Sequence, residues 1–124
     1  MRAFLLFLAL GLVSAPAAAD RAKFFGLWGT TQQCARDFIK PGGSVRAVPY
    51  EISEDWLKDG RVWCQLRWFP VEQRGAATFT GAHARCGEDA VRGYLLGMTL
   101  DGGALTLRWD VFRATPPLRR CPGG

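Results

Sequence analysis

The sequence has 124 residues and a formal net charge of +5 at pH 7, which is enough chain for one small domain with a modest core. The positive charges are scattered, and only Arg119 and Arg120 are adjacent, so they indicate a solvated surface. Such a surface favours an acidic partner, lipid head groups or an anionic glycan. It argues against inhibition of a basic lysozyme, for which an acidic surface is expected.

The first residues are typical of a secretory signal peptide. Arg2 gives a positive start, residues 3–13 are apolar, and the alanines at 17–19 form a small-residue cleavage site. The apolar run is too short for a membrane span, and no later run approaches that length. We therefore expect cleavage before Asp20, an exported protein that is periplasmic or secreted, no membrane span, and one domain over residues 20–124. An uncleaved N-terminal anchor is the alternative.

The domain is predicted to consist of short strands. Residues 20–25 are expected to form a helical turn, and residues 34–40 a short helix that ends at Pro41. Turn signals such as Asp59-Gly60 separate segments of alternating hydrophobicity. We expect strands at six places, which are 26–31, 45–52, 61–69, 76–86, 91–100 and 104–112. The connection 70–75 and the tail after 112 are expected to be irregular.

Residues 61–69 form the clearest predicted strand, because they follow a turn signal and stop at Pro70. Successive side chains of a strand point to opposite faces of a sheet. The buried face is expected to carry the apolar alternate residues, Val62, Cys64, Leu66 and Trp68. The mixed, half-solvated face carries Arg61, Trp63, Gln65, Arg67 and Phe69.

Closely spaced strands, glycine-rich turns and the lack of a long helical pattern predict an all-β fold. We expect a small antiparallel meander barrel of about six to eight strands with one short helix and two disulfides. A barrel is favoured over an open sheet because closure removes exposed strand edges.

The cysteines are expected to form two disulfides, because an even number in an exported chain is typical of cystine bridges. All four follow the cleavage site: Cys34, Cys64, Cys86 and Cys121. Of the three possible pairings we prefer Cys34–Cys64 and Cys86–Cys121, the second of which would hold the tail to the sheet. The spacing contains no C-x-x-C and His83 is near no cysteine pair, so we expect no metal site and no cofactor.

The first predicted strand contains Gly26-Leu27-Trp28, and this G-x-W motif resembles that of lipocalins and related calycin barrels. The resemblance implies that Trp28 closes the barrel floor beneath a basic residue from the end of the barrel. Arg108, Arg113 or Arg119 would supply that residue.

The chain also resembles small exported bacterial barrels of the metalloprotease-inhibitor type, which share the signal peptide, the G-x-W motif and a cysteine several residues later. With Cys-Gly-Glu-Asp at 86–89 it is similar to uncharacterised small periplasmic proteins of alphaproteobacteria. The last resemblance implies no known activity.

No catalytic constellation is evident. His83 is the single histidine and has no serine nearby to activate, so it is interpreted as a surface or sheet-face residue. The acidic residues of 51–59 match no calcium-binding loop and look like a solvated turn. These residues are Glu51, Glu54, Asp55 and Asp59. We therefore predict that the protein is not an enzyme.

The mixed face of residues 61–69 is the candidate binding surface, because aromatic rings among arginines can stack on a ligand. The candidate residues are Arg61, Trp63, Arg67 and Phe69. Packing of Trp63 under a loop is the alternative, and nucleic acid is discounted for an exported protein. We predict a non-enzymatic periplasmic binding protein that inhibits or partners another envelope protein. The alternative is a small-ligand carrier that uses the barrel interior.

Overall fold

A computed structural model of the chain describes residues 20–35, 48–60, 62–88, 92–109 and 113–122. Some predictions lie outside the described residues. They are the signal peptide over 1–19, the helical residues 36–40 with their stop at Pro41, the strand ends 45–47 and 110–112, and Arg61. No helix in the described ranges is both long enough and apolar enough to cross a membrane.

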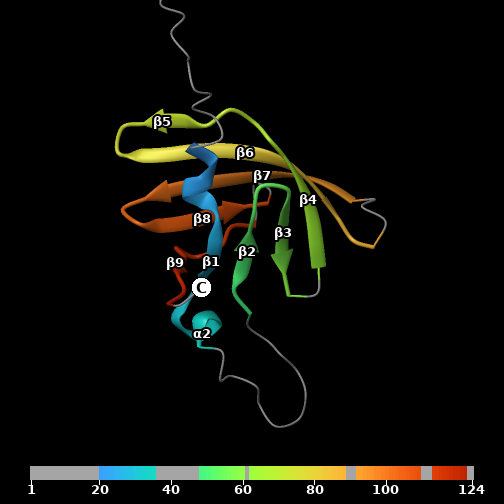
Figure 1. Ribbon diagram of the computed structural model, residues 1–124. Coiled ribbons are helices and arrows are strands. Elements are labelled where there is room, and N and C mark those ends of the chain that lie inside the picture. The colour runs from blue at the N-terminus through green and yellow to red at the C-terminus, as the bar shows by residue number, and fades with distance from the viewer. Residues whose placement is uncertain (1–19, 36–47, 61, 89–91, 110–112, 123–124) are drawn as a thin grey trace, which may run out of the picture.

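The described strands form one antiparallel sheet that curves into a nearly closed barrel (Figure 1). In chain order they are β1 Gly26–Gly29, β2 Tyr50–Ile52, β3 Trp56–Asp59, β4 Val62–Trp68, β5 Glu72–Arg74, β6 Ala77–Cys86, β7 Arg92–Asp101, β8 Ala104–Arg108 and β9 Arg119–Arg120. Eight of them follow the order β8-β7-β6-β4-β3-β2-β1-β9, and β5 pairs with β6. The short helical segments are η1 Ala22–Phe24 and α2 Thr31–Cys34. The predicted all-β barrel with one short helix and two disulfides is confirmed.

The tail closes the barrel, although it was expected to be irregular. Leu118 exchanges two backbone hydrogen bonds of 2.8 Å with Leu105 next to the last hairpin. The following residues form β9, in which Arg119 lies opposite Gly29 and Arg120 opposite Trp28 of β1. A two-residue strand is too short to show alternation in sequence, so only its pairing reveals it.

The connection 70–75 also contains a strand that the sequence did not reveal. The amide of Phe69 still donates to the carbonyl of Gly81 on β6, at 2.8 Å. Pro70 has no N–H to donate, which interrupts the ladder. The chain then resumes pairing with β6 as β5, so that β4 and β5 lie end to end along one side of β6.

Large side chains fill the inside of the barrel. The alternation of the last hairpin predicts an inward face on β7 and β8, and four of its residues are at most 1% exposed: Leu96, Met98, Leu105 and Leu107. Tyr94, Leu100 and Trp109 of the same face are only half-buried, and Val111 lies outside the described residues. The largest fully buried side chains include Trp28, Phe24, Leu57, Leu96, Met98, Leu105, Leu107 and Leu118. The inward prediction for Val62 is wrong: its exposed fraction is 46%, and it lies opposite Asp59 at the turn end of the β3–β4 hairpin.

The short helix begins earlier than the predicted range 34–40. Thr30 caps α2: its hydroxyl accepts from the amide of Gln33, and the Gln33 side chain accepts from the amide of Thr30. This capping box fixes where the helix begins. The Thr-x-x-Gln spacing at residues 30–33 is visible in the sequence, and it is the signal from which the start of the helix could have been predicted.

The preferred disulfide pairing is wrong. Cys64 and Cys86 lie directly opposite each other on β4 and β6, with both side chains inward and a Cα–Cα distance of 4.0 Å. Cys34, at the end of α2, bonds Cys121, which follows β9, across a Cα–Cα distance of 5.1 Å. The tail is therefore held to the first strand and its helix, rather than to the central strands.

Trp28 and Arg120 form the floor of the barrel. The Arg120 guanidinium lies 4.3 Å from the centre of the Trp28 ring and donates to the carbonyls of Phe25 at 2.7 Å and Lys23 at 2.6 Å. Trp28 Nε1 donates to a carbonyl of η1 at 2.9 Å. The expected basic partner of Trp28 is thus present, but it is Arg120 and not Arg108, Arg113 or Arg119, because Arg120 is the direct register partner of Trp28.

The same contact explains the glycine of the G-x-W motif. Gly26 has a φ of 127°, which residues with a Cβ rarely adopt. A Cβ at this position would also lie 2.9 Å from Nη1 of Arg120. Gly26, Trp28 and Arg120 therefore form one packing unit.

The disulfides can be checked by peptide mapping of the unreduced protein. We expect digestion to release one peptide pair that contains Cys34 and Cys121, and another that contains Cys64 and Cys86. In the chain-entropy account their loops of 87 and 22 residues contribute about 4–5 and about 3–4 kcal/mol to the free energy of unfolding. A peptide pair that joins Cys34 to Cys64 would contradict the fold described.

Replacing Arg120 by Lys should lower the free energy of unfolding by about 1–2 kcal/mol. A lysine cannot stack its charge as a plane on Trp28 while donating to two carbonyls. Urea unfolding followed by tryptophan fluorescence measures this loss. Arg119→Lys is the matched control and should change stability by less than about 0.5 kcal/mol, because the Arg119 side chain, unlike that of its likewise exposed neighbour, has no hydrogen bond or ring contact among the described residues. Equal losses for the two variants would refute the role of Arg120.

Candidate functional site

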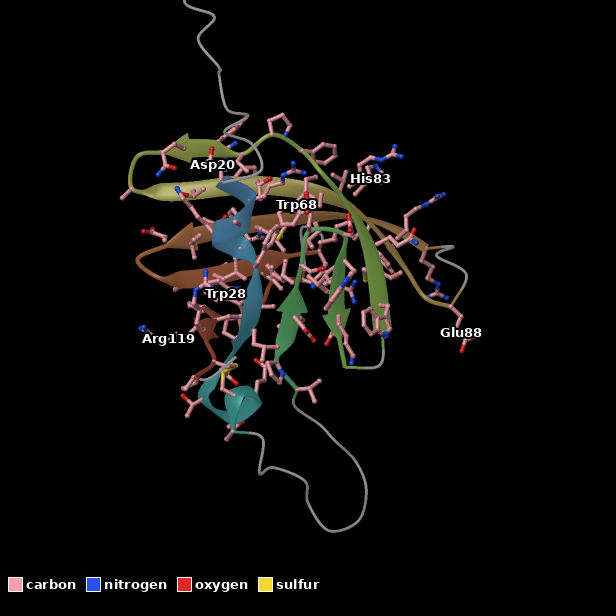
Figure 2. The ribbon with its side chains drawn as sticks, viewed as in Figure 1. Asp20, Trp28, Trp68, His83, Glu88 and Arg119 are labelled. Carbon is pink, nitrogen blue, oxygen red and sulfur yellow. A yellow bond between two sulfur atoms is a disulfide. The ribbon has the colours of Figure 1, made fainter. Side chains whose placement is uncertain are left out.

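The candidate site lies on the outside of β4, β6 and β7, which are neighbours in the sheet. We call this surface the outer face, and its residues are Trp63, Gln65, Arg67 and Phe69 of β4, Gly81, His83 and Arg85 of β6, and Leu95 and Gly97 of β7. Figure 2 shows His83 pointing away from the barrel and Trp28 on its inner side. The opposite parity of each strand carries the buried residues, so the alternation of the strands creates this face.

The outer face carries most of the exposed large apolar side chains of the described residues. Trp63 is 49%, Phe69 39% and Leu95 63% exposed, and the fourth such residue is Val62 at the end of β4. Isolated exposed apolar residues are common on protein surfaces, but Phe69 and Leu95 line the same apolar groove on either side of β6, and such a concentration indicates an interaction site.

A polar hollow of about 590 Å³ lies at the middle of the outer face. Arg67 is the register partner of His83, and Gln65 is that of Arg85, so the two arginines are diagonal neighbours. Both are exposed, and neither makes an ion pair within the described ranges. Asp55 lines the hollow without a salt bridge to either. We call this hollow the cationic hollow.

An apolar groove of about 570 Å³ adjoins the cationic hollow. Its floor is formed by Gly81 and Gly97, which face each other across β6 and β7. The Phe69 ring lies over Gly81, 3.0 Å from where a Cβ would be, whereas the nearest atoms to a Cβ at Gly97 are 3.8 Å away. Phe69, Phe79 and Leu95 form apolar walls, and Glu72 and Arg108 also line the groove. We call it the glycine groove.

Phe69 connects the two depressions. It lines the glycine groove, and its ring meets His83 of the cationic hollow edge to face, with 6.1 Å between ring centres. The residues lie in two rows across the sheet: Arg67, His83 and Leu95 in one, Phe69, Gly81 and Gly97 in the next. Since a strand rises about 3.4 Å per residue, the rows are about 7 Å apart.

Trp63 lies at the far end of the outer face, near the β3–β4 hairpin. Its ring packs against Trp56, with 4.8 Å between ring centres, and Lys58 Nζ lies 4.9 Å from the ring centre. Lys58 is also its register partner on β3. Part of the Trp63 surface therefore packs against residues of the neighbouring strand, in line with the alternative that this residue serves packing. Its side chain is nevertheless 49% exposed.

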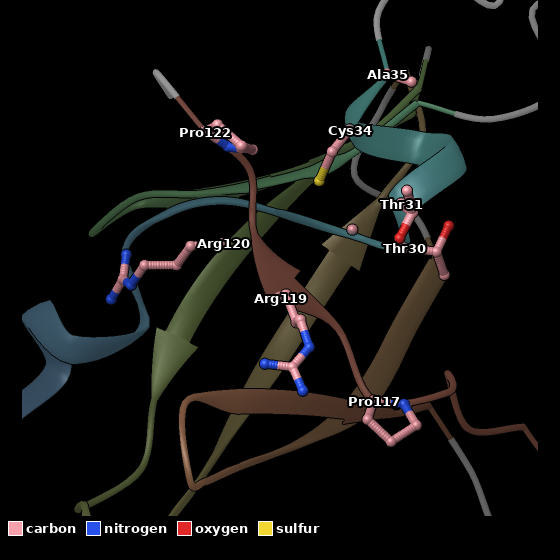
Figure 3. A pocket seen from close by; sticks show the side chains of 9 residues that line it. Thr30, Thr31, Cys34, Ala35, Pro117, Arg119, Arg120 and Pro122 are labelled. Atoms are coloured by element: carbon pink, nitrogen blue, oxygen red, sulfur yellow. The ribbon is translucent and has the colours of Figure 1, made fainter.

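A third hollow of about 570 Å³ lies at the other end of the barrel (Figure 3). Thr30 and Thr31 of the α2 cap, Arg119 of β9 and two prolines of the tail line it. Figure 3 shows Arg119 and Arg120 leaving β9 in different directions, with Arg120 toward η1. Cys34, which bonds Cys121, is among the residues that line this hollow, so the hollow lies where α2 and the tail are joined.

The sequence placed three of the four candidate binding residues on this surface. Trp63, Arg67 and Phe69 lie on the outer face of β4, and Arg61 lies outside the described residues. The structure brings Arg67 and Phe69 together with His83, Arg85 and the facing glycines, which the sequence did not assign to the site. No sequence signal could have joined them, because the pairing of β4 with β6 is non-local.

The acidic residues of 51–59 do not form a carboxylate cluster. Glu51 on β2 pairs in register with Lys58, whereas Asp55 lies at the cationic hollow. In the part of the chain that the structure describes, no group of three or more His, Cys, Asp or Glu side chains is placed to hold a metal ion.

Burial shifts two ionisable groups on β2 and β3. It raises the pKa of the Asp59 carboxyl above its ordinary value of 3.8, although the residue keeps solvent contact. Burial also raises the pKa of Tyr50, and the nearby Asp59 charge adds to this shift. Both lie away from the cationic hollow and the glycine groove.

Comparison with known proteins finds no matching family model, no significantly similar curated protein and no significantly similar solved structure. The function is therefore argued from the geometry of the described residues.

The raised pKa of Asp59 predicts a pH dependence of stability. The folded state keeps the Asp59 proton at pH values where the unfolded chain has released it, so the free energy of unfolding falls as pH rises through the window just above 3.8. Asp59→Asn removes this contribution, and its stability relative to wild type should increase as pH rises from about 4 to about 6. Urea midpoints at several pH values measure the difference. If the wild type instead becomes more stable relative to Asp59→Asn as pH rises, the raised pKa of Asp59 is contradicted.

Proposed function

We propose that the protein is a non-enzymatic binding protein of the periplasm that recognises another envelope protein through its outer face. The observation that carries the proposal is the position of the glycine groove beside the cationic hollow, on one face and connected by Phe69. Protein interfaces are enriched in aromatic residues and arginine, and their strongest contacts fill apolar pockets.

Two observations support a protein partner over a ligand inside the barrel. The interior is filled by large side chains that are at most 2% exposed, among them Trp28, Leu57 and Met98. The apolar groove and the exposed aromatic residues are on the outside. The barrel and its Trp28–Arg120 floor agree with a lipocalin-like scaffold, and a small-ligand carrier of that type remains the alternative function.

The two disulfides are consistent with an oxidising compartment such as the periplasm. An inhibitor of an envelope enzyme is one form of the proposed partnership, since such inhibitors present a preformed, rigid surface. The cystine between β4 and β6 links two of the strands that carry the outer face.

Site-specific photocrosslinking tests the proposal. A photoreactive amino acid at Leu95, which is 63% exposed, should give a protein-sized adduct in an envelope extract. The same amino acid at Gln32, which is exposed on α2 at the other end of the barrel, should not. The adduct should disappear when Phe69→Ser is added. Equal adducts at both positions would contradict the proposal, and a small added mass in native mass spectrometry would favour the carrier.

A further inference from the structure

We infer that the outer face binds an extended peptide segment in which an acidic residue and a bulky apolar residue are two positions apart. This inference rests on the proposed function and adds the chemistry of the partner. The carboxylate would lie at the cationic hollow, between Arg67 and Arg85, and the apolar side chain in the glycine groove.

The cationic hollow supplies the charge argument. Arg67 and His83 are cross-strand partners, and Arg85 is the diagonal neighbour of Arg67. Diagonal neighbours on one face of a sheet are about 7–8 Å apart, so the two positive charges repel each other. No carboxylate within the described residues forms an ion pair with either arginine. An anion from outside would relieve this repulsion, and two arginines can donate to both oxygens of a carboxylate.

The glycine groove supplies the shape argument. Because Gly97 has no side chain, a side chain from outside can reach the sheet backbone there, between Leu95 and the Phe69 ring that covers Gly81. Burying an aromatic or large aliphatic side chain there contributes through the apolar area removed from water, and the exposed parts of both walls would be covered.

The spacing of the two sites selects an extended segment. The rows that contain Arg67 and Phe69 are about 7 Å apart, which is also the distance between alternate side chains on one face of an extended peptide. A segment that runs along β6 would therefore place an acidic residue and an apolar residue two positions later over the two hollows. In a helix these positions point in different directions.

Binding of short probe peptides to the whole protein tests the inference. The probe is Thr-Glu-Thr-Phe-Thr with blocked ends, so that Glu carries its only charge. We expect amide chemical shifts of Gly81, Arg85 and Gly97 to move on titration, as followed by NMR. Affinity should fall about threefold to tenfold when Gln replaces the Glu of the probe. It should also fall when Ala replaces Phe, or when Glu and Phe are made adjacent.

Matched glycine variants locate the apolar side chain. A Cβ at Gly97 meets its nearest neighbours at 3.8 Å, which is ordinary contact, so the backbone accepts a side chain here and Gly97→Val adds one inside the groove. Gly93 lies on the same face of β7 and has no atom within 4 Å of its Cβ position, so Gly93→Val adds the same side chain outside the groove. We expect Gly97→Val to weaken probe binding about tenfold or more and Gly93→Val to leave it nearly unchanged. Arg67→Gln should remove the preference for Glu over Gln.

Other results would overturn the inference. If the probe and its variants bind equally or not at all while the Leu95 adduct forms, the peptide chemistry is wrong and the proposed function stands. If the probe does not bind and the Leu95 adduct does not form, both the inference and the proposed function are rejected. A concentration-dependent dimer that protects Leu95 from crosslinking to other proteins would assign the face to a second copy of the chain, against the inference.

Discussion

The stacking of Arg120 on Trp28 is the contact on which the barrel depends. It joins the last strand to the first, and its two hydrogen bonds to backbone carbonyls hold η1 across the same end of the barrel. The Cys34–Cys121 bond fastens the tail beyond this point, and the Leu105–Leu118 bridge joins it to β8. Closure thus comes from a few tail residues that meet distant parts of the chain.

Because side chains fill the interior of this barrel, a partner can contact only its outer surface. Strand alternation assigns one parity of β4, β6 and β7 to the core, so the other parity faces solvent whatever its chemistry. In this protein that parity carries exposed aromatic residues, two arginines that form no ion pair with any described residue, and two facing glycines. The Cys64–Cys86 bond on the inner side of the sheet ties β4 to β6.

The sequence predicted part of the candidate site, and it did so from the single strand at residues 61–69. Alternation in 61–69 was enough to place Trp63, Arg67 and Phe69 on one surface, because period 2 is a local property of the backbone. It could not show that Trp63 packs with Trp56 and Lys58, nor that Arg67 lies beside His83. Those contacts depend on register with β3 and β6, which is set by pairing across the sheet.

The sequence by itself determined the all-β barrel, the turn at Gly60, the inward residues of the last hairpin and the presence of two disulfides, because these follow from local periodicity and composition. Only the tertiary structure decided which cysteines pair, which arginine covers Trp28, and that residues 72–74 and 119–120 are strands. Each of these joins residues far apart in the chain. Their distance is set by the closure and register of the whole sheet, which no local pattern specifies.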